Sequence, residues 1–312
     1  MAERHHYISQ FHLRGFLDPK STHTSDPWFW VGDCLQGTIV RRSPKNTGWQ
    51  RGMFDGPGAF ANPDLSLESF LSKEVEGPAA TALRNWVLLP QGKRGSIPPE
   101  VFRYVTWAAA RSLPMLQLFE DWTNALPPDA QCVYPPPPGF EKIQWGGGVH
   151  CMWHPTLGIR QDVPSEQVHA LRGQGWQVRM GKDDFLPAVH FQAWYFQVQM
   201  FPLLQWGILD APPGQYFIIA DRPVVWGVRL WGEEGWKLAV DVPPYYLRDP
   251  KVQLVAPLTR SVALFAFHRS SLPPVMVRPD DVNRIVACGA RHWIAGPTKA
   301  TVAAALEHDR VL

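Results

Sequence analysis

The residues best suited to chemistry gather near the start of the chain, in segment 5–16 with the sequence H-H-Y-I-S-Q-F-H-L-R-G-F. Three histidines, a tyrosine, a glutamine and an arginine lie there among apolar residues, and so many polar groups are costly to bury without partners. Histidine can transfer protons or bind a divalent metal, and arginine can hold an anion. The segment therefore predicts a reaction centre, or else a buried polar network that fixes one packing of the core. Its candidate catalytic residues are His5, His6, Tyr7, Gln10 and Arg14.

Charged residues elsewhere could complete such a centre. Arg111 lies in a predicted helix that is apolar nearly all round, so its charge must meet a carboxylate, a phosphate or backbone carbonyls. It is a sixth candidate catalytic residue, with a structural buried ion pair as the alternative. Asp221 ends a predicted buried strand and Glu68 lies on a predicted amphipathic helix; with His5 and His6 they are the candidate metal ligands. An Asx-type turn and a solvated helix surface are the alternatives for these two carboxylates.

A basic and aromatic patch lies in and after a predicted hairpin, with Arg41, Arg42 and Trp49 as candidate substrate-binding residues. Stacking on Trp49 beside these cations would suit a nucleotide or another phosphate-bearing ligand, whereas a solvated hairpin arm is the plainer interpretation. The run His150-Cys151-Met152-Trp153-His154 offers metal-binding groups at close spacing but no second half-site. Its role stays open, a structural zinc included.

The opening segment resembles a large, mostly bacterial family known as domain of unknown function 4238, whose members begin roughly H-H-Y-x-x-Q-F-x-L-R-x-F. Later motifs resemble the family in the same order: an L-E-x-x-L helix with Glu68, an R-x-x-P with Arg111, a D-x-P-V with Asp221, and Asn283 near the start of a late helix. Two departures are Ser9, where proline is usual, and Glu74, a second helical carboxylate placed one position early. The resemblance implies that Asn283 orients a ligand or bonds to the loop around Asp221, and it implies no settled chemistry.

Composition limits the class of protein. The 312 residues are 45% hydrophobic and 19% charged, which predicts a globular chain with a large core. A net charge of +2 does not support bulk nucleic-acid binding, and the four scattered cysteines predict reduced thiols. No run approaches the ~20 apolar residues that cross a bilayer, and the start lacks the order of a signal peptide. We therefore expect a soluble, cytoplasmic protein that makes no membrane contact.

The elements that must position these residues change type along the chain. Strand runs at 28–31 and 38–41 predict a hairpin, 65–75 and 79–89 predict helices interrupted at Pro78, and a long helix starts at Pro98-Pro99 and runs to about residue 121. Further helices are expected at 165–172, 184–200, 280–294 and 299–308. Strands are expected at 204–209 and 216–220 as a pair, and at 253–258 and 262–267, with an edge or bulge at Pro257. The fold class is α+β, with a helical first half packed on a mostly antiparallel sheet from the second half plus the early hairpin. Residues 1–312 form one compact domain, or two lobes, 1–126 and 150–312, joined by the Pro/Gly-rich segment 127–149.

Three functions fit these residues. The first is an enzyme that hydrolyses a phosphate-bearing substrate, a nucleotide or nucleic acid, with a divalent metal as an allowed cofactor. The second is a tailoring enzyme for an apolar or aromatic small molecule, suggested by fifteen tryptophans and the modest net charge. The third is a binding protein whose motif residues form a structural network. Convergence of the motif side chains on an open cleft would favour an enzyme, and mutual satisfaction away from solvent would favour the scaffold.

Overall fold

The predicted α+β class is confirmed: the sheets are antiparallel, helices lie mostly in the first half and strands mostly in the second. The computed structural model describes residues 4–51, 70–90, 93–112, 124, 149–179, 189, 192–193, 195–232, 235–239, 248–271 and 278–309. In this described part, no helix is both long and apolar enough to cross a membrane.

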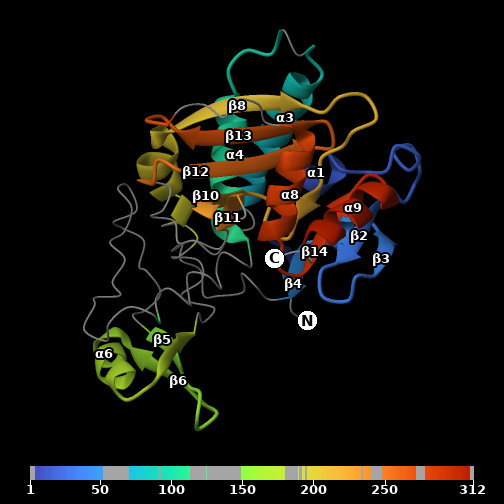
Figure 1. Ribbon diagram of the computed structural model, residues 1–312. Coiled ribbons are helices and arrows are strands. Elements are labelled where there is room, and N and C mark those ends of the chain that lie inside the picture. Colours follow the sequence, from blue (N-terminus) through green and yellow to red (C-terminus); the bar gives the residue numbers. More distant parts are fainter. Residues whose placement is uncertain are drawn as a thin grey trace.

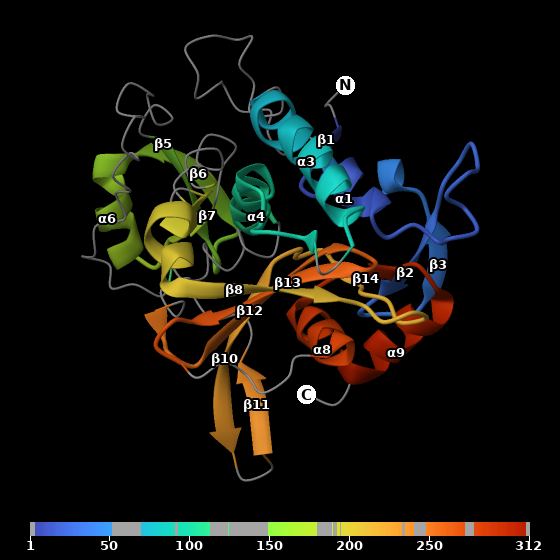
Figure 2. The same cartoon turned by 90° about the horizontal axis from the view of Figure 1, so that it is seen from above.

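A five-stranded antiparallel sheet forms the centre of the molecule, with strands in the order β11-β10-β12-β13-β8. These are β8 (Leu204–Asp210), β10 (Val225–Gly232), β11 (Gly235–Ala239), β12 (Val252–Thr259) and β13 (Val262–His268). Figure 2 shows α3 (Gly77–Val87) and α4 (Pro99–Arg111) over one face and α8 (Pro279–Gly289) over the other. Because both faces are covered, β12 and β13 are apolar and mostly buried along their length. The two strands predicted here are confirmed, they pair with each other, and their register shifts between Pro257 and Thr259, so that the bulge is the predicted alternative that the structure contains.

A second sheet has the order β3-β2-β14-β9 and is flanked by α9 (Lys299–Asp309). The predicted early hairpin is confirmed as β2 (Phe29–Asp33) and β3 (Ile39–Arg42). Two predictions fail here. The strands at 204–209 and 216–220 do not pair, since β8 pairs with β13 while β9 (Ile219–Ala220) pairs with β14 (Trp293–Gly296). The helix expected to reach 294 ends at Gly289, because 293–296 is the central strand β14.

The chain enters α3 through a π-helix, η2 (Leu71–Glu76), in which the Gly77 amide donates to the Ser72 carbonyl five residues back. The helical path therefore continues across Pro78 instead of breaking there, because proline tolerates the first turn of a helix. The predicted helix start near 65 lies outside the described residues. The long helix predicted to run to about residue 121 ends at Arg111 instead, because the backbone of Ser112 is extended. Part of the run predicted at 184–200 is described as a second π-helix, η4 (Tyr195–Met200), followed by the short 3₁₀ turn η5 (Phe201–Leu203).

A small unit carries its own core of Met152, Val163 and Val168 (Figure 1). It consists of β5 (Val149–His154), β6 (Ile159–Pro164), α6 (Ser165–Gly173) and β7 (Gln177–Arg179), and α6 confirms the predicted helix. The main core contains residues from Tyr7 to Leu306. The division into one domain or two lobes stays a prediction, because residues 125–148 lie outside the described part.

Candidate functional site

The opening signature begins as a strand, so its two histidines point to different sides. In β1 (Arg4–His6), successive side chains alternate across the strand, and β1 pairs antiparallel with β4 (Trp49–Arg51). His5 is 4% exposed and part of the interior, whereas His6 is half-buried and lines a pocket. The two histidines therefore do not converge on one point, and only His6 reaches the pocket.

The chain then turns into the short helix α1 (Gln10–Arg14), which again divides the signature. Gln10 and Phe11 face the pocket, His12 is buried, and Arg14 is exposed at the helix end. Ser9 occupies the predicted N-cap position, but its side chain caps nothing because the hydroxyl is engaged elsewhere.

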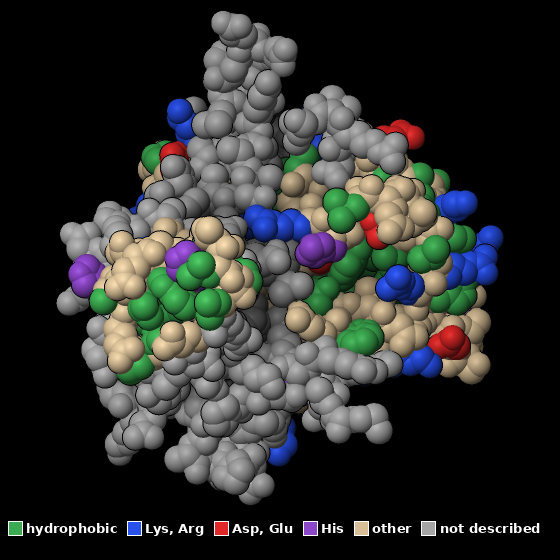
Figure 3. Space-filling model, turned by 90° about the horizontal axis from the view of Figure 1, so that it is seen from below, with side chains coloured by type: hydrophobic (Ala, Val, Ile, Leu, Met, Phe, Trp, Pro, Cys, Tyr) green, Lys and Arg blue, Asp and Glu red, His purple; other side chains and the backbone are tan. Residues whose placement is uncertain are grey.

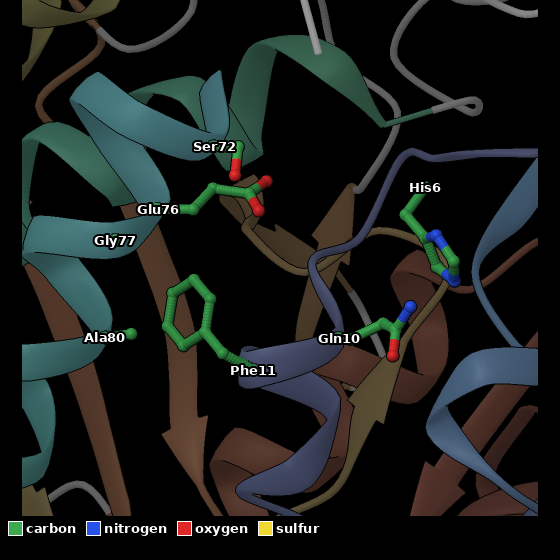
Figure 4. A pocket seen from close by; sticks show the side chains of 7 residues that line it. All are labelled: His6, Gln10, Phe11, Ser72, Glu76, Gly77 and Ala80. Carbon is green, nitrogen blue, oxygen red and sulfur yellow. The ribbon is translucent and has the colours of Figure 1, made fainter. Parts of the chain in front are cut away.

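The pocket has a volume of about 260 Å³ and lies between the signature and the π-helix. Figure 4 shows Glu76 pointing from η2 towards the side occupied by His6 and Gln10, with Phe11 below and Ser72 beside it. The pocket is lined by seven described residues: His6, Gln10, Phe11, Ser72, Glu76, Gly77 and Ala80. The wall therefore combines an imidazole, an amide, a hydroxyl and a carboxylate with one aromatic ring.

Glu76 is the residue that joins the pocket to the buried interior. Its Oε1 accepts a hydrogen bond from Ser9 Oγ at 2.6 Å and lies 2.6 Å from Arg111 Nη1. Arg111 also donates through Nη2 to Ser9 Oγ. The Arg111 side chain is 1% exposed and that of Glu76 is 21% exposed, so the ion pair is anchored in the core and opens towards the pocket at one end.

The surroundings of Glu76 favour its ionised form. Burial alone would raise the pKa of this carboxyl, but the Arg111 charge, the hydrogen bonds from Ser9 and Arg111, and the nearby His6 together hold the pKa below its ordinary value. Within the described residues, the contacts of the carboxylate all go to Oε1. Glu76 Oε2 is thus the anionic atom available to a ligand.

Behind this ion pair, His12 connects α1 to α4 and to the central sheet. Its Nε2 lies 2.7 Å from the Pro257 carbonyl oxygen and its Nδ1 lies 2.9 Å from Tyr104 Oη. Because a carbonyl can only accept, Nε2 carries the proton, and the Tyr104 hydroxyl donates to Nδ1. Burial lowers the pKa of His12 to about 4 and raises that of Tyr104 to about 12, so both are neutral near pH 7. These two residues are structural neighbours of the site and do not line it.

Asp221 and Tyr7 belong to a different cluster, at the junction of β9 and β14. The Asp221 oxygens accept the backbone amides of Arg291 at 3.1 Å and His292 at 2.9 Å, and burial raises its pKa to about 6. Tyr7 Oη accepts from Trp293 Nε1 at 3.1 Å, and burial raises the pKa of Tyr7 to about 12. Both side chains fasten this junction and are not among the pocket-lining residues.

Asn283 holds the segment that leads into β9. Its Oδ1 accepts the Ile218 amide at 3.0 Å and its Nδ2 donates to the Tyr216 carbonyl at 2.8 Å. The resemblance implied that Asn283 either orients a ligand or bonds to the loop around Asp221. The structure contains the second of these, because Asn283 bonds to the backbone that leads through β9 to Asp221.

The predicted binding patch separates into two places. Arg41 stacks over Trp28 and Trp30, with its guanidinium carbon 4.3 and 4.9 Å from the ring centroids. Arg42 is exposed on the same edge strand β3. On the face in Figure 3, Lys and Arg side chains gather towards the right-hand margin among hydrophobic ones. Trp49 lies elsewhere, directly opposite His6 in the β1–β4 pair, which places it next to the pocket.

Of the two carboxylates singled out on the first helices, only Glu74 lies in the described part of the chain, and it is not among the residues that line the pocket. Glu68 lies outside the described residues, and Glu74 is exposed on η2. Among the described residues, no three His, Cys, Asp or Glu side chains come together as a group able to hold a metal ion. The run 150–154 forms strand β5, where His154 Nδ1 accepts the Leu157 amide at 3.3 Å.

Glu76, Ser9 and Tyr104 were missed as site residues by the sequence analysis. The signal that could have found Glu76 is Arg111, since a buried guanidinium needs a carboxylate on the neighbouring helix. If the helix is drawn as an α-helix from Leu71, Glu76 does not fall on the buried face, because the π-helix adds one residue to the turn.

Comparison with known proteins supports the resemblance over the first third of the chain. Residues 4–105 match the family model described as Protein of unknown function (DUF4238). The DUF4238 match includes the signature, the hairpin, η2 with Glu76, and α4 as far as Val105, and it ends before Arg111. No curated protein and no solved structure matches the chain.

Proposed function

We propose that the protein is a hydrolase and that a small, phosphate-bearing molecule reacts in the pocket between His6 and Glu76. The observation that carries the proposal is an ionised Glu76, whose contacts with the described residues all go to Oε1, on a pocket wall shared with His6. A carboxylate with a lowered pKa is a weak base and a good partner for a cation, so proton transfer falls to the imidazole.

The charge of the pocket decides how a phosphate could enter it. The Arg111 charge is already shared with Glu76, so the wall would repel a bare phosphate. A divalent cation between Glu76 and the substrate removes that conflict, and Mg²⁺ commonly binds through one or two carboxylates plus substrate phosphates. Glu76 Oε2 would hold the ion, which would supply charge neutralisation at the phosphoryl oxygens.

In the proposed reaction, His6 accepts a proton from water as the water oxygen forms a bond to phosphorus. The bond from phosphorus to the leaving oxygen breaks, the leaving oxygen takes up a proton from solvent, and His6 releases its proton to solvent. Gln10 can orient either oxygen through its amide, and Phe11 supplies an apolar surface for the rest of the substrate.

The test is hydrolysis of p-nitrophenyl phosphate and bis-p-nitrophenyl phosphate with and without Mg²⁺ or Mn²⁺. We expect metal-dependent turnover that falls by roughly 10²-fold or more in His6→Gln. Glu76→Gln should weaken the metal dependence, whereas the control Glu74→Gln changes an exposed carboxylate on the same π-helix and should keep wild-type turnover. Turnover that is absent with every metal, or unchanged in a folded His6→Gln variant, would refute the proposal.

A second candidate function, ligand binding without catalysis, is favoured by the hydrogen-bonded pair of His12 and Tyr104. These signature-linked groups are bonded to each other and to the sheet away from solvent, as expected of a scaffold that presents a binding pocket. If the protein only binds, His6→Gln should abolish ligand-induced thermal stabilisation while no substrate is turned over.

A further inference from the structure

We propose that Ser9 is the positioning residue of this pocket: it fixes one oxygen of Glu76 and leaves the other to the ligand. Ser9 is 1% exposed and does not line the pocket, so its hydroxyl cannot touch a substrate. The inference rests on the proposed function only in taking Glu76 as the ligand-binding group.

The direction of each hydrogen bond at Ser9 follows from the chemistry of its partners. A guanidinium can only donate, so Ser9 Oγ accepts from Arg111. Its single proton is then free to be donated to Glu76 Oε1. Ser9 therefore links the buried arginine to the carboxylate. While Arg111 is in place, Ser9 must accept from Arg111 and donate to Glu76, and the two roles cannot be exchanged.

The groups behind Ser9 keep it in this orientation. The hydroxyl proton of Tyr104 is committed to His12 Nδ1, so towards the neighbouring Arg111 the Tyr104 oxygen can only accept. His12 in turn is fixed by the Pro257 carbonyl, next to the register shift of β12. A directed chain thus runs from the central sheet through α1 and α4 to the pocket wall.

A simpler role for Ser9, filling space in the core, makes a different prediction. A space-filling hydroxyl would affect stability only, whereas a positioning hydroxyl also sets the titration of Glu76. The titratable groups that face Glu76 are Arg111 on α4 and His6 on β1, with His12 and Tyr104 behind them. Arg111 and Tyr104 do not change charge between pH 2 and pH 7. Of the groups that face Glu76, only His6 and His12 can therefore change charge in that range and alter its titration.

The experiment is carbon-13 NMR of the glutamate side-chain carboxyls in the full-length protein, with the Glu76 signal assigned from its loss in Glu76→Gln. We expect Ser9→Ala to raise the Glu76 midpoint by about one pH unit, because a hydrogen bond to the charged form is lost. Ser9→Thr keeps the hydroxyl and should restore the wild-type midpoint. The matched control is Ser21→Ala, which removes a buried hydroxyl that donates to the Trp28 carbonyl at 2.6 Å.

Ser21→Ala should lower stability and leave the Glu76 midpoint unchanged. A wild-type midpoint in Ser9→Ala, or an equal shift in Ser21→Ala, would overturn the inference. The titration needs no substrate, so it still decides the role of Ser9 if no hydrolysis or metal binding is found. Conversely, if the wild type turns over substrate and the Glu76 midpoint in Ser9→Ala equals that of the wild type, the proposed function holds but Ser9 has no positioning role in it.

Discussion

The ion pair between Arg111 and Glu76 gives the sharpest test of the site, because its two ends differ in exposure. The side chains are 1% and 21% exposed, and the joining distance is 2.6 Å. Removing one member of a buried pair typically costs about 3–5 kcal/mol, mainly because the other charge is left uncompensated. Without Glu76, the Arg111 side chain would lose this charged partner where it has almost no access to water, whereas Glu76 without Arg111 can be solvated from the pocket.

We therefore expect Glu76→Leu to lower the free energy of unfolding by about 3–5 kcal/mol and Arg111→Met to lower it by less. The double variant should be more stable than Glu76→Leu alone, since it strands no charge. Urea denaturation followed by tryptophan fluorescence measures all three, and Trp107 on α4 and Trp86 on α3 lie in the same core. Glu74→Leu, exposed on the same π-helix, is the control and should stay within about 0.5 kcal/mol of wild type.

The reasoning fails if the costs of Glu76→Leu and Arg111→Met simply add in the double variant. Additive costs would mean that the two charges do not interact in solution. It also fails if Arg111→Met lowers the free energy of unfolding by more than Glu76→Leu does. That result would mean that Glu76, and not Arg111, is the member of the pair that water cannot reach.

Three further predictions concern the core around the site. The pKa of His12 is about 4 in the folded protein against an ordinary 6.5, so wild type should lose stability relative to His12→Gln as pH falls from about 6.5 to 4. The pKa of Asp221 is about 6 against an ordinary 3.8, so wild type should gain stability relative to Asp221→Asn as pH falls from about 6 to 3.8. Each change should be on the order of 3 kcal/mol in urea titrations, and equal slopes for wild type and both variants would contradict this. Asn283→Ala deletes two hydrogen bonds to the backbone before β9 and should cost about 1–3 kcal/mol in thermal unfolding, against which an unchanged melting temperature would count. Gly289→Ala should be destabilising by about 1–3 kcal/mol, because the new Cβ would lie 2.5 Å from a methyl carbon of Val225, and a neutral effect would show that α8 can move off β10.

The sequence predicts the central strands well and their partners less well. The runs that become β12 and β13 are continuous and apolar, so their existence could be read from the hydrophobic pattern. The runs that become β8 and β9 also follow one another in the chain, yet each pairs with a strand far along the sequence and not with the other. Asn283 on α8 holds the backbone between them, a long-range contact that local pattern cannot reveal.

The candidate site shows the same limit at the level of single residues. That Arg111 must find a partner follows from its apolar helix, and the structure contains that partner. Which carboxylate it finds depends on the extra residue of the π-helix, which turns Glu76 rather than Glu74 towards the core. Helix propensities do not encode such an inserted residue, so the sequence pattern alone could not select Glu76.

The signature itself explains why a compact set of polar residues can serve the core and the pocket together. As a strand it sends His5 inward and His6 to the pocket, and as a helix it sends His12 inward and Gln10 to the pocket. Ser9 lies at the change of period, where one buried hydroxyl can reach both the arginine of the core and the carboxylate of the pocket. A substitution that alters the local period at Ser9 would therefore disturb both the packing of the core and the pocket, whereas His6→Gln should change the chemistry of the pocket and leave the core packing intact.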